Sequence, residues 1–388
     1  MNERKLLMIP GPIEFEPAVL RAMAVKTPSH LAPDFIEVFG QALEMLRQVF
    51  LAQEGQPFVV AGSGTLAMDM AAANLIEPGD HALVVNCGYF GDRFAAMCGR
   101  YGAQVTQVKA AWGDVPSPEE VKAALSGRKY KLMTITHVDT STGVRCDVPT
   151  LGRLAREHGA LSVVDGVCAT AGEEFRQEEW GIDVYLTASQ KALGVPPGLA
   201  LLVVSPQALE AFEARRSPVG NYYADWANWR PIMEAYEARR GSYFATPPVN
   251  LIYALHQSLQ QILAEGMEAR FRRHKIISEA FKAAIAAMGL KQVPVRPEVA
   301  AHTLTAIYYP EGVDSSLLGR IKENGVVVAG GLDPQRGGQY FRVGHMGVVS
   351  ASDILATVGA IERALAASGF EFELGTGVAA AQEALAQL

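Results

Sequence analysis

Short apolar runs alternate with amphipathic stretches between about residues 57 and 205. The apolar runs predict buried strands, because a short continuous apolar segment is typical of a strand covered on both faces. The stretches between them predict helices, and several end at turn residues such as Pro78-Gly79-Asp80 and Gly102. We predict strands at 58–61, 82–86, 132–136, 161–164, 184–188 and 200–204, and helices at 65–75, 90–101, 118–125 and 150–158.

This alternation predicts an α/β fold, with a three-layer α-β-α large domain around a mostly parallel sheet. Ligands of such sheets bind at the carboxyl ends of the strands. Beyond residue 250 the pattern changes, and it predicts a smaller C-terminal α+β domain that starts near residue 266. From residue 249 onward, helices are predicted at 249–263, 267–288 and 350–366, and strands at 302–309, 326–329 and 340–343.

The length of 388 residues favours two domains, since it exceeds what one core usually supports. Hydrophobic residues make up 49% of the chain and charged residues 19%, which indicates a compact protein. We therefore predict a large domain at 19–265 and a small one at 266–388. The tail at 375–388 is rich in Ala and Gln, and we expect a frayed or loosely docked helix there.

Charge and cysteine usage exclude several classes of function. A net charge of −7 disfavours a nucleic-acid partner, and the four cysteines show no CxxC pairing, as expected of a reduced protein. No secretory signal is evident, and the longest uncharged stretch, 192–209, contains Pro196-Pro197-Gly198, so we predict a cytoplasmic protein without a membrane partner. The eight histidines lack metal-ligand spacing, so no metal site is expected.

The most informative candidates are a lysine and an aspartate at the ends of two predicted strands. Lys191 follows the strand at 184–188, and Asp165 follows the strand at 161–164. Pyridoxal phosphate needs such a pair, since the amine forms a Schiff base with its aldehyde and the carboxylate keeps its pyridine nitrogen protonated. Taken singly, Asp165 could equally be a cap or turn residue and Lys191 an ordinary exposed lysine. Together they predict pyridoxal 5'-phosphate as the cofactor.

A turn rich in glycine and hydroxyl groups follows the strand at 58–61. Ser63, Gly64 and Thr65 open the next helix, and the amino end of a helix favours a phosphate. A simple helix cap would have the same sequence, so this prediction depends on Lys191 and Asp165.

Two further residues just past strand ends could contact a cofactor ring. Phe90 offers an aromatic face that could stack on a pyridine, with core packing as the alternative. Thr140 offers a hydroxyl that could instead satisfy a turn backbone, and the nearby His137 is more typical of a structural histidine.

Arg342 interrupts the apolar strand at 340–343. A charge in such a strand must be paired or bind something, and a guanidinium fits a carboxylate through two parallel hydrogen bonds. An internal ion pair and a substrate carboxylate are both open at this point.

With these residues in place, the chain resembles the class V aminotransferases of fold type I. Within them it is most similar to the alanine–glyoxylate aminotransferases of the fungal branch, to which the serine–pyruvate aminotransferases are related. The resemblance runs from Pro10-Gly11-Pro12 to about Gly347, and several blocks in one order are a stronger signal than any single block. The blocks are Ala61-Gly62-Ser63-Gly64-Thr65-Leu66, Thr136-His137-Val138-Asp139-Thr140-Ser141-Thr142, Thr187-Ala188-Ser189-Gln190-Lys191-Ala192, Tyr243-Phe244-Ala245-Thr246-Pro247-Pro248 and Arg342-Val343-Gly344-His345-Met346-Gly347.

The resemblance implies a role for each of these residues toward the cofactor. It makes Lys191 the Schiff-base lysine and Asp165 the partner of the pyridine nitrogen, with Phe90 stacked on the ring and Thr140 beside it. The residues around the phosphate would be Ser63, Gly64, Thr65 and Gln190.

It also implies partners. Tyr243 and Thr246 match residues that reach the phosphate of the neighbouring subunit, so we expect a homodimer. Arg342 would hold the substrate carboxylate, assisted by the backbone at Gly11, within an N-terminal segment, 1–18, that contributes to the active site.

Two positions depart from the family pattern. Gly166 follows Asp165 where relatives commonly carry Ala or Ser, which leads us to expect a more mobile loop. Phe90 stands where relatives often have Trp, whose larger ring would retain the cofactor better.

The activity implied is transamination between alanine and glyoxylate, giving pyruvate and glycine by a ping-pong sequence through the pyridoxamine form. Serine–glyoxylate or serine–pyruvate transamination uses the same residues and stays open. A cysteine desulfurase needs a cysteine downstream of the lysine, and none follows Cys168. A 2-aminoethylphosphonate aminotransferase fits the block at Arg342 less well. Intact Lys191, Asp165 and Arg342 argue against a non-catalytic relative of the fold.

Overall fold

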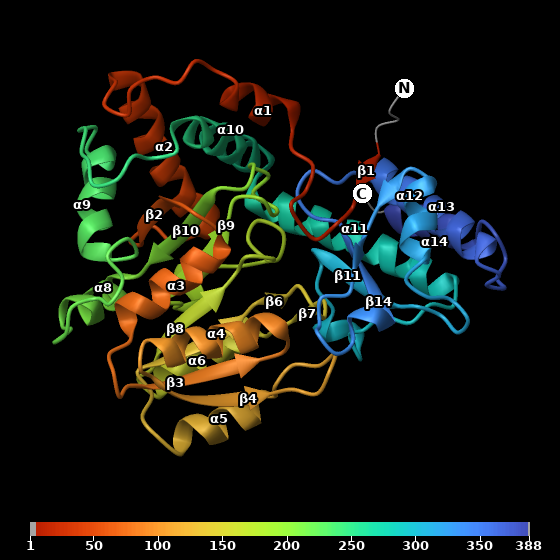
Figure 1. Ribbon diagram of the computed structural model, residues 1–388, viewed down its shortest axis with the longest axis horizontal. Helices are drawn as coiled ribbons and strands as arrows, with labels where there is room; N and C mark the ends of the chain where they lie inside the picture. The colour runs from red at the N-terminus through yellow and green to blue at the C-terminus, as the bar shows by residue number, and fades with distance from the viewer. Residues whose placement is uncertain (1–4, 387–388) are drawn as a thin grey trace.

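The computed structural model describes residues 5–386, and Figure 1 shows its arrangement. Residues 1–4 of the predicted N-terminal segment and residues 387–388 of the predicted tail lie outside the described residues. Most of the first two thirds of the chain forms the left part of Figure 1, and the C-terminal third, in teal to blue, forms the right part together with the N-terminal strand β1.

A seven-stranded sheet organises the first part of the chain. Five neighbouring strands are parallel, and β10 is antiparallel to both β9 and β2 at the other edge, so the prediction of a mostly parallel sheet is confirmed. In spatial order the strands are β2 (Gln56–Ala61), β10 (Leu199–Val204), β9 (Val184–Ala188), β8 (Leu161–Asp165), β5 (Leu132–Thr136), β3 (His81–Asn86) and β4 (Gln104–Lys109).

Strand β4 is the one strand of this sheet that the sequence did not predict. Its residues, Gln-Val-Thr-Gln-Val-Lys, alternate polar and apolar and are half-buried or exposed, because β4 forms the edge of the sheet. An edge strand with a polar face lacks the continuous apolar run that identified the others.

Helices cover both faces of the sheet. On one side α3 packs on β9, β10 and α4, and on the other α5 and α6 pack on each other and against β3, β5 and β8. The four helices predicted in this region are all present, within two residues of the predicted bounds. They are α3 (Gly64–Leu75), α4 (Tyr89–Arg100), α5 (Pro118–Ser126) and α6 (Val148–Glu157).

The helix starts have local causes in the sequence. Ser117 and Glu120 form a capping box at α5, in which the side chain of each accepts a hydrogen bond from the backbone N–H of the other. At α6, the Asp147 side chain accepts the Thr150 N–H. The other helices of this part are α1 (Pro17–Met23), α2 (Pro33–Phe50), α7 (Gln177–Trp180), α8 (Pro206–Glu213), α9 (Trp226–Glu237) and α10 (Val249–Glu265).

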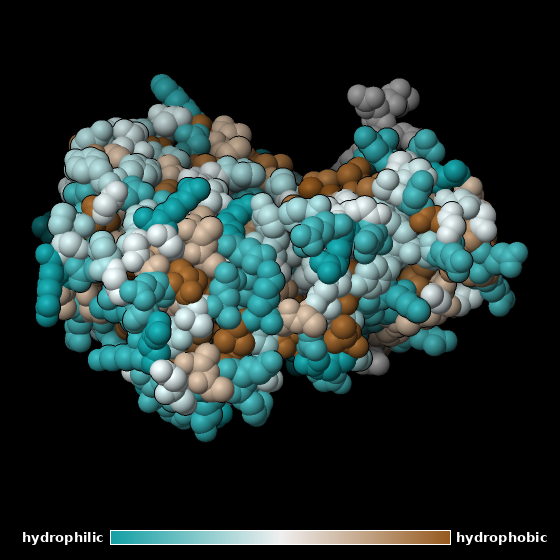
Figure 2. Space-filling model, turned by 60° about the horizontal axis from the view of Figure 1, so that its bottom comes forward, coloured by the Kyte–Doolittle hydropathy of each residue, from teal (hydrophilic) through white to brown (hydrophobic). Residues whose placement is uncertain are grey.

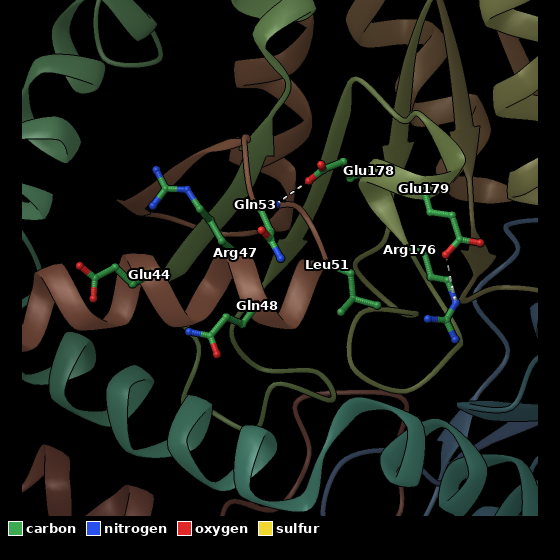
Figure 3. A pocket seen from close by; sticks show the side chains of 8 residues that line it. All are labelled: Glu44, Arg47, Gln48, Leu51, Gln53, Arg176, Glu178 and Glu179. Carbon is green, nitrogen blue, oxygen red and sulfur yellow. Dashed lines mark hydrogen bonds and ion pairs between the residues drawn. The ribbon is translucent and has the colours of Figure 1, made fainter.

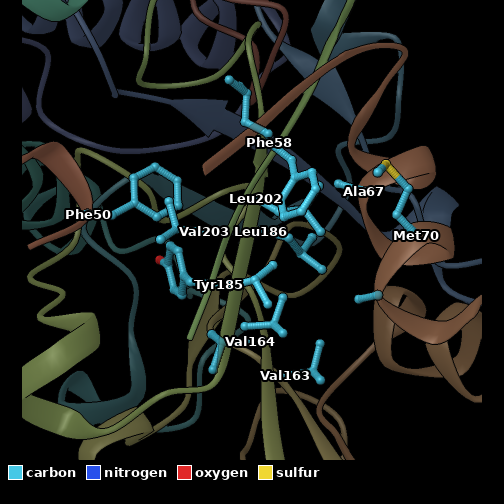
Figure 4. Close-up of a cluster of buried hydrophobic side chains, with 14 of the residues drawn as sticks. Phe50, Phe58, Ala67, Met70, Val163, Val164, Tyr185, Leu186, Leu202 and Val203 are labelled. Carbon is cyan, nitrogen blue, oxygen red and sulfur yellow. The ribbon is translucent and has the colours of Figure 1, made fainter. Parts of the chain in front are cut away.

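Successive strand residues pack into two different layers. In Figure 4, Tyr185 points with Phe50 of α2 to one side of the sheet, while Leu186 points with Phe58 toward Ala67 of α3 on the other. Both strand residues are fully buried, which explains why the central strands are apolar throughout rather than alternating.

The C-terminal part has its own cluster of buried apolar side chains, made by Met8 and by residues from Ile277 to Ala381. Its elements are α11 (Met267–Ala287), β11 (Leu304–Tyr308), α12 (Leu317–Glu323), β12 (Val326–Val327), β13 (Ala329–Gly330), β14 (Tyr340–Gly344), α13 (Ala351–Ala367) and α14 (Thr376–Leu385). The domain boundary near residue 266 stays a prediction.

The single strand predicted at 326–329 is wrong. The run at 326–329 does not form a single strand, because it divides between two sheets. Strand β12 pairs in parallel with β1 (Leu6–Leu7), whereas β13 pairs with β14, which also pairs with β11. The N-terminal segment is thereby fixed to the C-terminal part, and Figure 1 shows β1 beside α12.

The described part of the tail is firmly placed. Helix α14 packs against α11 and α13, with Gly377 and Ala381 buried. The Glu362 carboxylate of α13 accepts the N–H groups of Gly375 and Gly377. The expected loose docking is therefore wrong for residues 375–386.

The surface in Figure 2 is largely hydrophilic, with apolar side chains scattered among polar ones, and the molecule narrows between its two parts. Between residues 5 and 386, none of the helices combines the length and the apolar character needed to cross a bilayer.

Candidate active site

A cavity of about 190 Å³ lies at the carboxyl ends of the central strands. Nine of the residues that the sequence predicted line it: Gly11, Ser63, Gly64, Thr65, Phe90, Thr140, Asp165, Gln190 and Lys191. The fold thus gathers into one place side chains that are up to 180 positions apart along the chain (Gly11 to Lys191). Arg342, Tyr243 and Thr246 do not line it.

Lys191 lies in the turn that follows β9 and is buried. Its Nζ donates a hydrogen bond to the Pro10 carbonyl, so the N-terminal segment holds the amine in position. Gly11 faces the same side chain, and the Ile13 N–H donates to the Gln190 carbonyl at 3.2 Å. The N-terminal segment therefore holds both the lysine amine and the backbone next to it.

Asp165 is the last residue of β8, the neighbour of β9. The Val167 N–H donates to its Oδ1 at 2.9 Å. Burial raises the pKa of Asp165 to about 6, and the Val167 N–H and the Lys191 charge oppose that rise. A buried carboxylate of this kind is stabilised by a cationic group placed beside it.

The glycine after Asp165 has a specific structural reason. A β-carbon at Gly166 would lie 2.2 Å from Cζ and 2.4 Å from the hydroxyl oxygen of Tyr185. The Tyr185 ring stacks on Phe175 with centroids 3.4 Å apart, and its hydroxyl lies 3.1 Å from Nδ1 of His137. The ring of Tyr185 therefore fills the space that a side chain at position 166 would need. Glycine at this position accompanies a tightly packed loop, so the greater mobility expected from the sequence is not supported.

Asp139 organises the start of α4, where Phe90 lies. Its Oδ2 accepts the Phe90 N–H at 3.0 Å, and its Oδ1 accepts the Ser141 N–H at 2.8 Å. Burial raises the pKa of Asp139, and the hydrogen bonds from Ser141 and Phe90 lower it. No role was predicted for Asp139, which does not line the cavity but holds the backbone of Phe90, which does.

The turn at 62–65 keeps its polar groups available. Ser63 is the N-cap of α3, but its side chain makes no capping hydrogen bond. Gln190 has an amide oxygen that is buried without a partner in the structure. Ser63 and Thr65 are exposed, so this end of the cavity opens to solvent in the single chain.

These features fit pyridoxal phosphate. The buried amine and buried carboxylate lie on neighbouring strand ends, as the aldehyde and the ring nitrogen require. The start of α3, whose backbone N–H groups have no capping side chain, lines the cavity and could donate hydrogen bonds to a phosphate. Gln190 lines the same cavity, but its unpartnered amide oxygen accepts hydrogen bonds and would not donate to a phosphate.

Arg342 borders the cavity through the backbone. It lies in β14, and its Nε donates to the Gly330 carbonyl at 2.8 Å and its Nη1 to the Thr140 carbonyl at 3.1 Å. Burial lowers the pKa of Arg342, and within residues 5–386 its hydrogen-bond partners are carbonyls, not carboxylates. Of the two alternatives for Arg342, an internal ion pair is therefore not the one observed.

Tyr243 and Thr246 point elsewhere. Both are exposed, and Tyr243 is exposed to 62%, with its ring 5.4 Å from that of His30. In a single chain neither contributes to the cavity.

Several lining residues were not singled out from the sequence: Met68, Arg93, Val138, Val167 and Cys168. Apolar residues next to polar motifs carry no signal of their own, and Arg93 lies on an ordinary amphipathic helix. Burial raises the pKa of Cys168, which makes its thiol a poor nucleophile. In the part of the chain that is described, no cluster of three or more His, Cys, Asp or Glu side chains could hold a metal ion.

A wider cavity of about 830 Å³ lies between α2 and the segment 176–179, and Figure 3 shows its lining. Its charged side chains are already engaged, since Arg47 pairs with Glu237, and Arg176 with Glu268 at 2.7 Å. None of its lining residues belongs to the cavity at Lys191.

Known proteins are similar to this chain in sequence and in fold. The aminotransferase class-V family model matches residues 19–336. Alanine–glyoxylate aminotransferase 1 of Saccharomyces cerevisiae is 40% identical over 359 residues, covering 89% of this chain and 93% of that protein. L-aspartate–glyoxylate aminotransferase of Paracoccus denitrificans is 37% identical, covering 99% and 96%. The crystal structure of alanine–glyoxylate aminotransferase from Nostoc sp. has a TM-score of 0.88 and 35% identity, covering 94% and 96%.

Proposed function

This chain belongs to the aminotransferase class-V family and uses pyridoxal phosphate, and on that premise we propose that it transfers an amino group from alanine to glyoxylate, giving pyruvate and glycine. The observation that carries the proposal is the single cavity in which Lys191 and Asp165 meet the turn at 63–65. A relative that is 40% identical over most of the chain is named for this reaction.

When bound, pyridoxal phosphate supplies an aldehyde that takes up the amino group and a ring that accepts the electrons released at Cα. Lys191 would hold the aldehyde while the enzyme rests. Its Nζ, once freed by the substrate amine, would be the base that removes the proton from the substrate Cα and the acid that later gives it back. The Pro10 carbonyl keeps this amine within reach, because it accepts its hydrogen bond.

Asp165 would keep a proton on the ring nitrogen. Its burial makes an isolated negative charge costly, so a cationic nitrogen beside it is stabilised in turn. A ring that stays protonated is the stronger electron acceptor, which is what removal of the Cα proton requires.

Arg342 would bind the carboxylate that amino and oxo acids share, together with the backbone at Gly11. Its position supports this role, since it holds the Thr140 carbonyl in the cavity wall and its partners are neutral. A guanidinium without a carboxylate partner favours an anionic ligand.

The donor is the finer part of the proposal. Three charged side chains line the cavity, Arg93, Asp165 and Lys191, and the wall near Thr140 includes the apolar Val138. A second carboxylate, as in aspartate, would need a cation of its own, and Arg93, the one lining cation without a role so far, is hydrogen-bonded to Thr65 in the turn where the phosphate would lie. This favours a small uncharged side chain, as in alanine, and leaves serine as the alternative donor.

We also infer a homodimer. The phosphate end of the cavity is open in one chain, while Tyr243 and Thr246 are exposed and outside it. A second subunit that brings these two residues over Ser63 and Thr65 would close the site. A test mixes Lys191→Ala chains with Thr246→Val chains. If each site combines Lys191 of one subunit with Thr246 of the other, a mixed dimer has one site in which both residues are intact, and activity returns. If each site uses both residues of the same chain, no site is intact and no activity returns.

The reaction is tested with the holoenzyme and single amino donors. We expect alanine alone to convert the bound cofactor to its amine form, seen as a loss of its visible absorbance, with one equivalent of pyruvate released. Glyoxylate alone should then restore the absorbance and release glycine, so initial rates should give parallel double-reciprocal lines. Conversion by serine or aspartate at much higher kcat/KM than by alanine would overturn the choice of donor.

A further inference from the structure

Arg93 is a cation in the cofactor cavity that the predicted roles leave unexplained. It lies in the first half of α4, one turn after Tyr89, and lines the cavity together with Lys191. Its Nη1 donates to the Thr65 hydroxyl at 3.1 Å and its Nη2 to the Tyr89 hydroxyl at 3.3 Å. Its guanidinium carbon also lies 5.0 Å from the centre of the Phe90 ring.

No described carboxylate forms a direct ion pair with Arg93, and Asp165 acts on it only through a longer-range charge interaction. Arg93 is half-buried, and its direct contacts among the described residues are hydroxyl groups and aromatic rings, all neutral. The acid next to it on the helix, Asp92, is already engaged by Lys109 at 2.8 Å and by Asn86 at 2.7 Å. A half-buried guanidinium with neutral partners attracts an anion.

The charges in the cavity match the groups of the cofactor. Three lining side chains are charged. Lys191 is assigned to the aldehyde and Asp165 to the ring nitrogen, which leaves the phosphate, with up to two negative charges, among hydroxyls and amides. Neutral donors alone compensate such a group poorly when water is excluded.

The position of Arg93 agrees with that of the phosphate. Thr65, which accepts its hydrogen bond, lies in the first turn of α3, where Ser63 leaves the helix start uncapped. Helices α3 and α4 pack together, and residues at the amino ends of both, Thr65 and Phe90, line the cavity.

We propose that Arg93 is the cationic ligand of the cofactor phosphate, acting beside Thr65 at the amino end of α3. This rests on the proposed function, since it assumes that the phosphate lies at residues 63–65. It also gives Phe90 a second contact, because the same guanidinium packs on the ring that is expected to stack on the cofactor.

The test compares two cofactors that differ only in the phosphate. Dissociation constants of pyridoxal phosphate and of pyridoxal are measured on the cofactor-free protein by equilibrium dialysis, for wild type, Arg93→Gln and Arg93→Lys. We expect Arg93→Gln to weaken pyridoxal phosphate about 10- to 100-fold and to leave pyridoxal unchanged, with Arg93→Lys in between. Arg100→Gln, which removes an exposed arginine at the other end of α4, is the matched control and should change neither.

The other outcomes overturn the inference. Equal weakening of both ligands would mean that Arg93 only supports the fold. Unchanged affinities for both ligands, with a raised KM for alanine and glyoxylate, would make it a substrate residue. If instead wild type binds neither ligand, the proposed function itself fails, whatever Arg93 does.

Discussion

A β-carbon at Gly11 would lie 2.5 Å from Cδ and 2.8 Å from Nζ of Lys191. The residue has a φ of +111°, a region that favours glycine, so both its backbone and its lack of a side chain are used. The N-terminal segment therefore approaches the lysine amine more closely than any other residue type would allow.

The first prediction follows from this contact. Gly11→Ala should lower kcat by at least about tenfold, because the lysine or the segment must shift, and a displacement of this size costs catalysis heavily. Gly79→Ala is the matched control, since Gly79 has a φ of +94° with nothing within 4 Å of its β-carbon position. It should lose stability from backbone strain but keep its turnover. The measurement is the steady-state kcat of both variants. Equal kcat values would show that the close approach of Gly11 to Lys191 has no role in catalysis.

Gly166 and Tyr185 should be energetically coupled. Gly166→Ala places a β-carbon against the Tyr185 ring, and we expect a loss of about 1–3 kcal/mol of unfolding free energy from overpacking. In a Tyr185→Leu background the same change should cost less than half as much, because the ring is gone. Urea unfolding of wild type, the two single variants and the double variant gives the coupling energy between the two residues. Additive costs would mean that the two residues do not compete for the same space.

Asp165 should make the cofactor-free protein less stable as the pH rises. Its pKa in the folded state is about 6 against a usual value of 3.8, so the folded protein favours the protonated form, and stability falls as the pH rises through that window. Asp165→Asn cannot ionise and can still accept the Val167 N–H. Its stability relative to wild type should therefore rise by on the order of 1–2 kcal/mol between pH 5 and pH 7.5. A constant difference across this range would contradict the burial argument.

Arg342 should act on substrate binding rather than on cofactor binding. Arg342→Gln should raise KM for alanine and for glyoxylate about 30-fold or more, because a paired carboxylate contact is worth at least about 2 kcal/mol. The affinity for pyridoxal phosphate should stay within about twofold of wild type. Arg363→Gln, an exposed arginine on α13, serves as the control. Unchanged KM values would reduce Arg342 to a support for the Thr140 carbonyl.

The central strands could be predicted because burial on both faces leaves a continuous apolar run, and the predicted strand ends located Asp165 and Lys191. All five residues of β8 are buried, and so are all five of β9. Since these two strands are parallel neighbours, Asp165 and Lys191 had to lie at the same edge of the sheet. The edge strand β4 was missed for the opposite reason, because half of its surface faces water.

Other features depended on packing between elements that are distant in sequence. Arg93 gains its position only when α4 packs on α3, and Tyr185 looks like any core residue until its ring is seen to fill the space at Gly166. The split of 326–329 into β12 and β13 required strand β1 as a partner, which the sequence did not predict.

The most direct measurement is to find where the cofactor is covalently attached. Borohydride reduction of the holoenzyme makes the carbon–nitrogen bond permanent, and peptide mass spectrometry then locates the added mass. We predict that it is found on the Nζ of Lys191 and that Lys191→Ala carries none. Attachment to a different lysine, or none in wild type that holds the cofactor, would contradict the account.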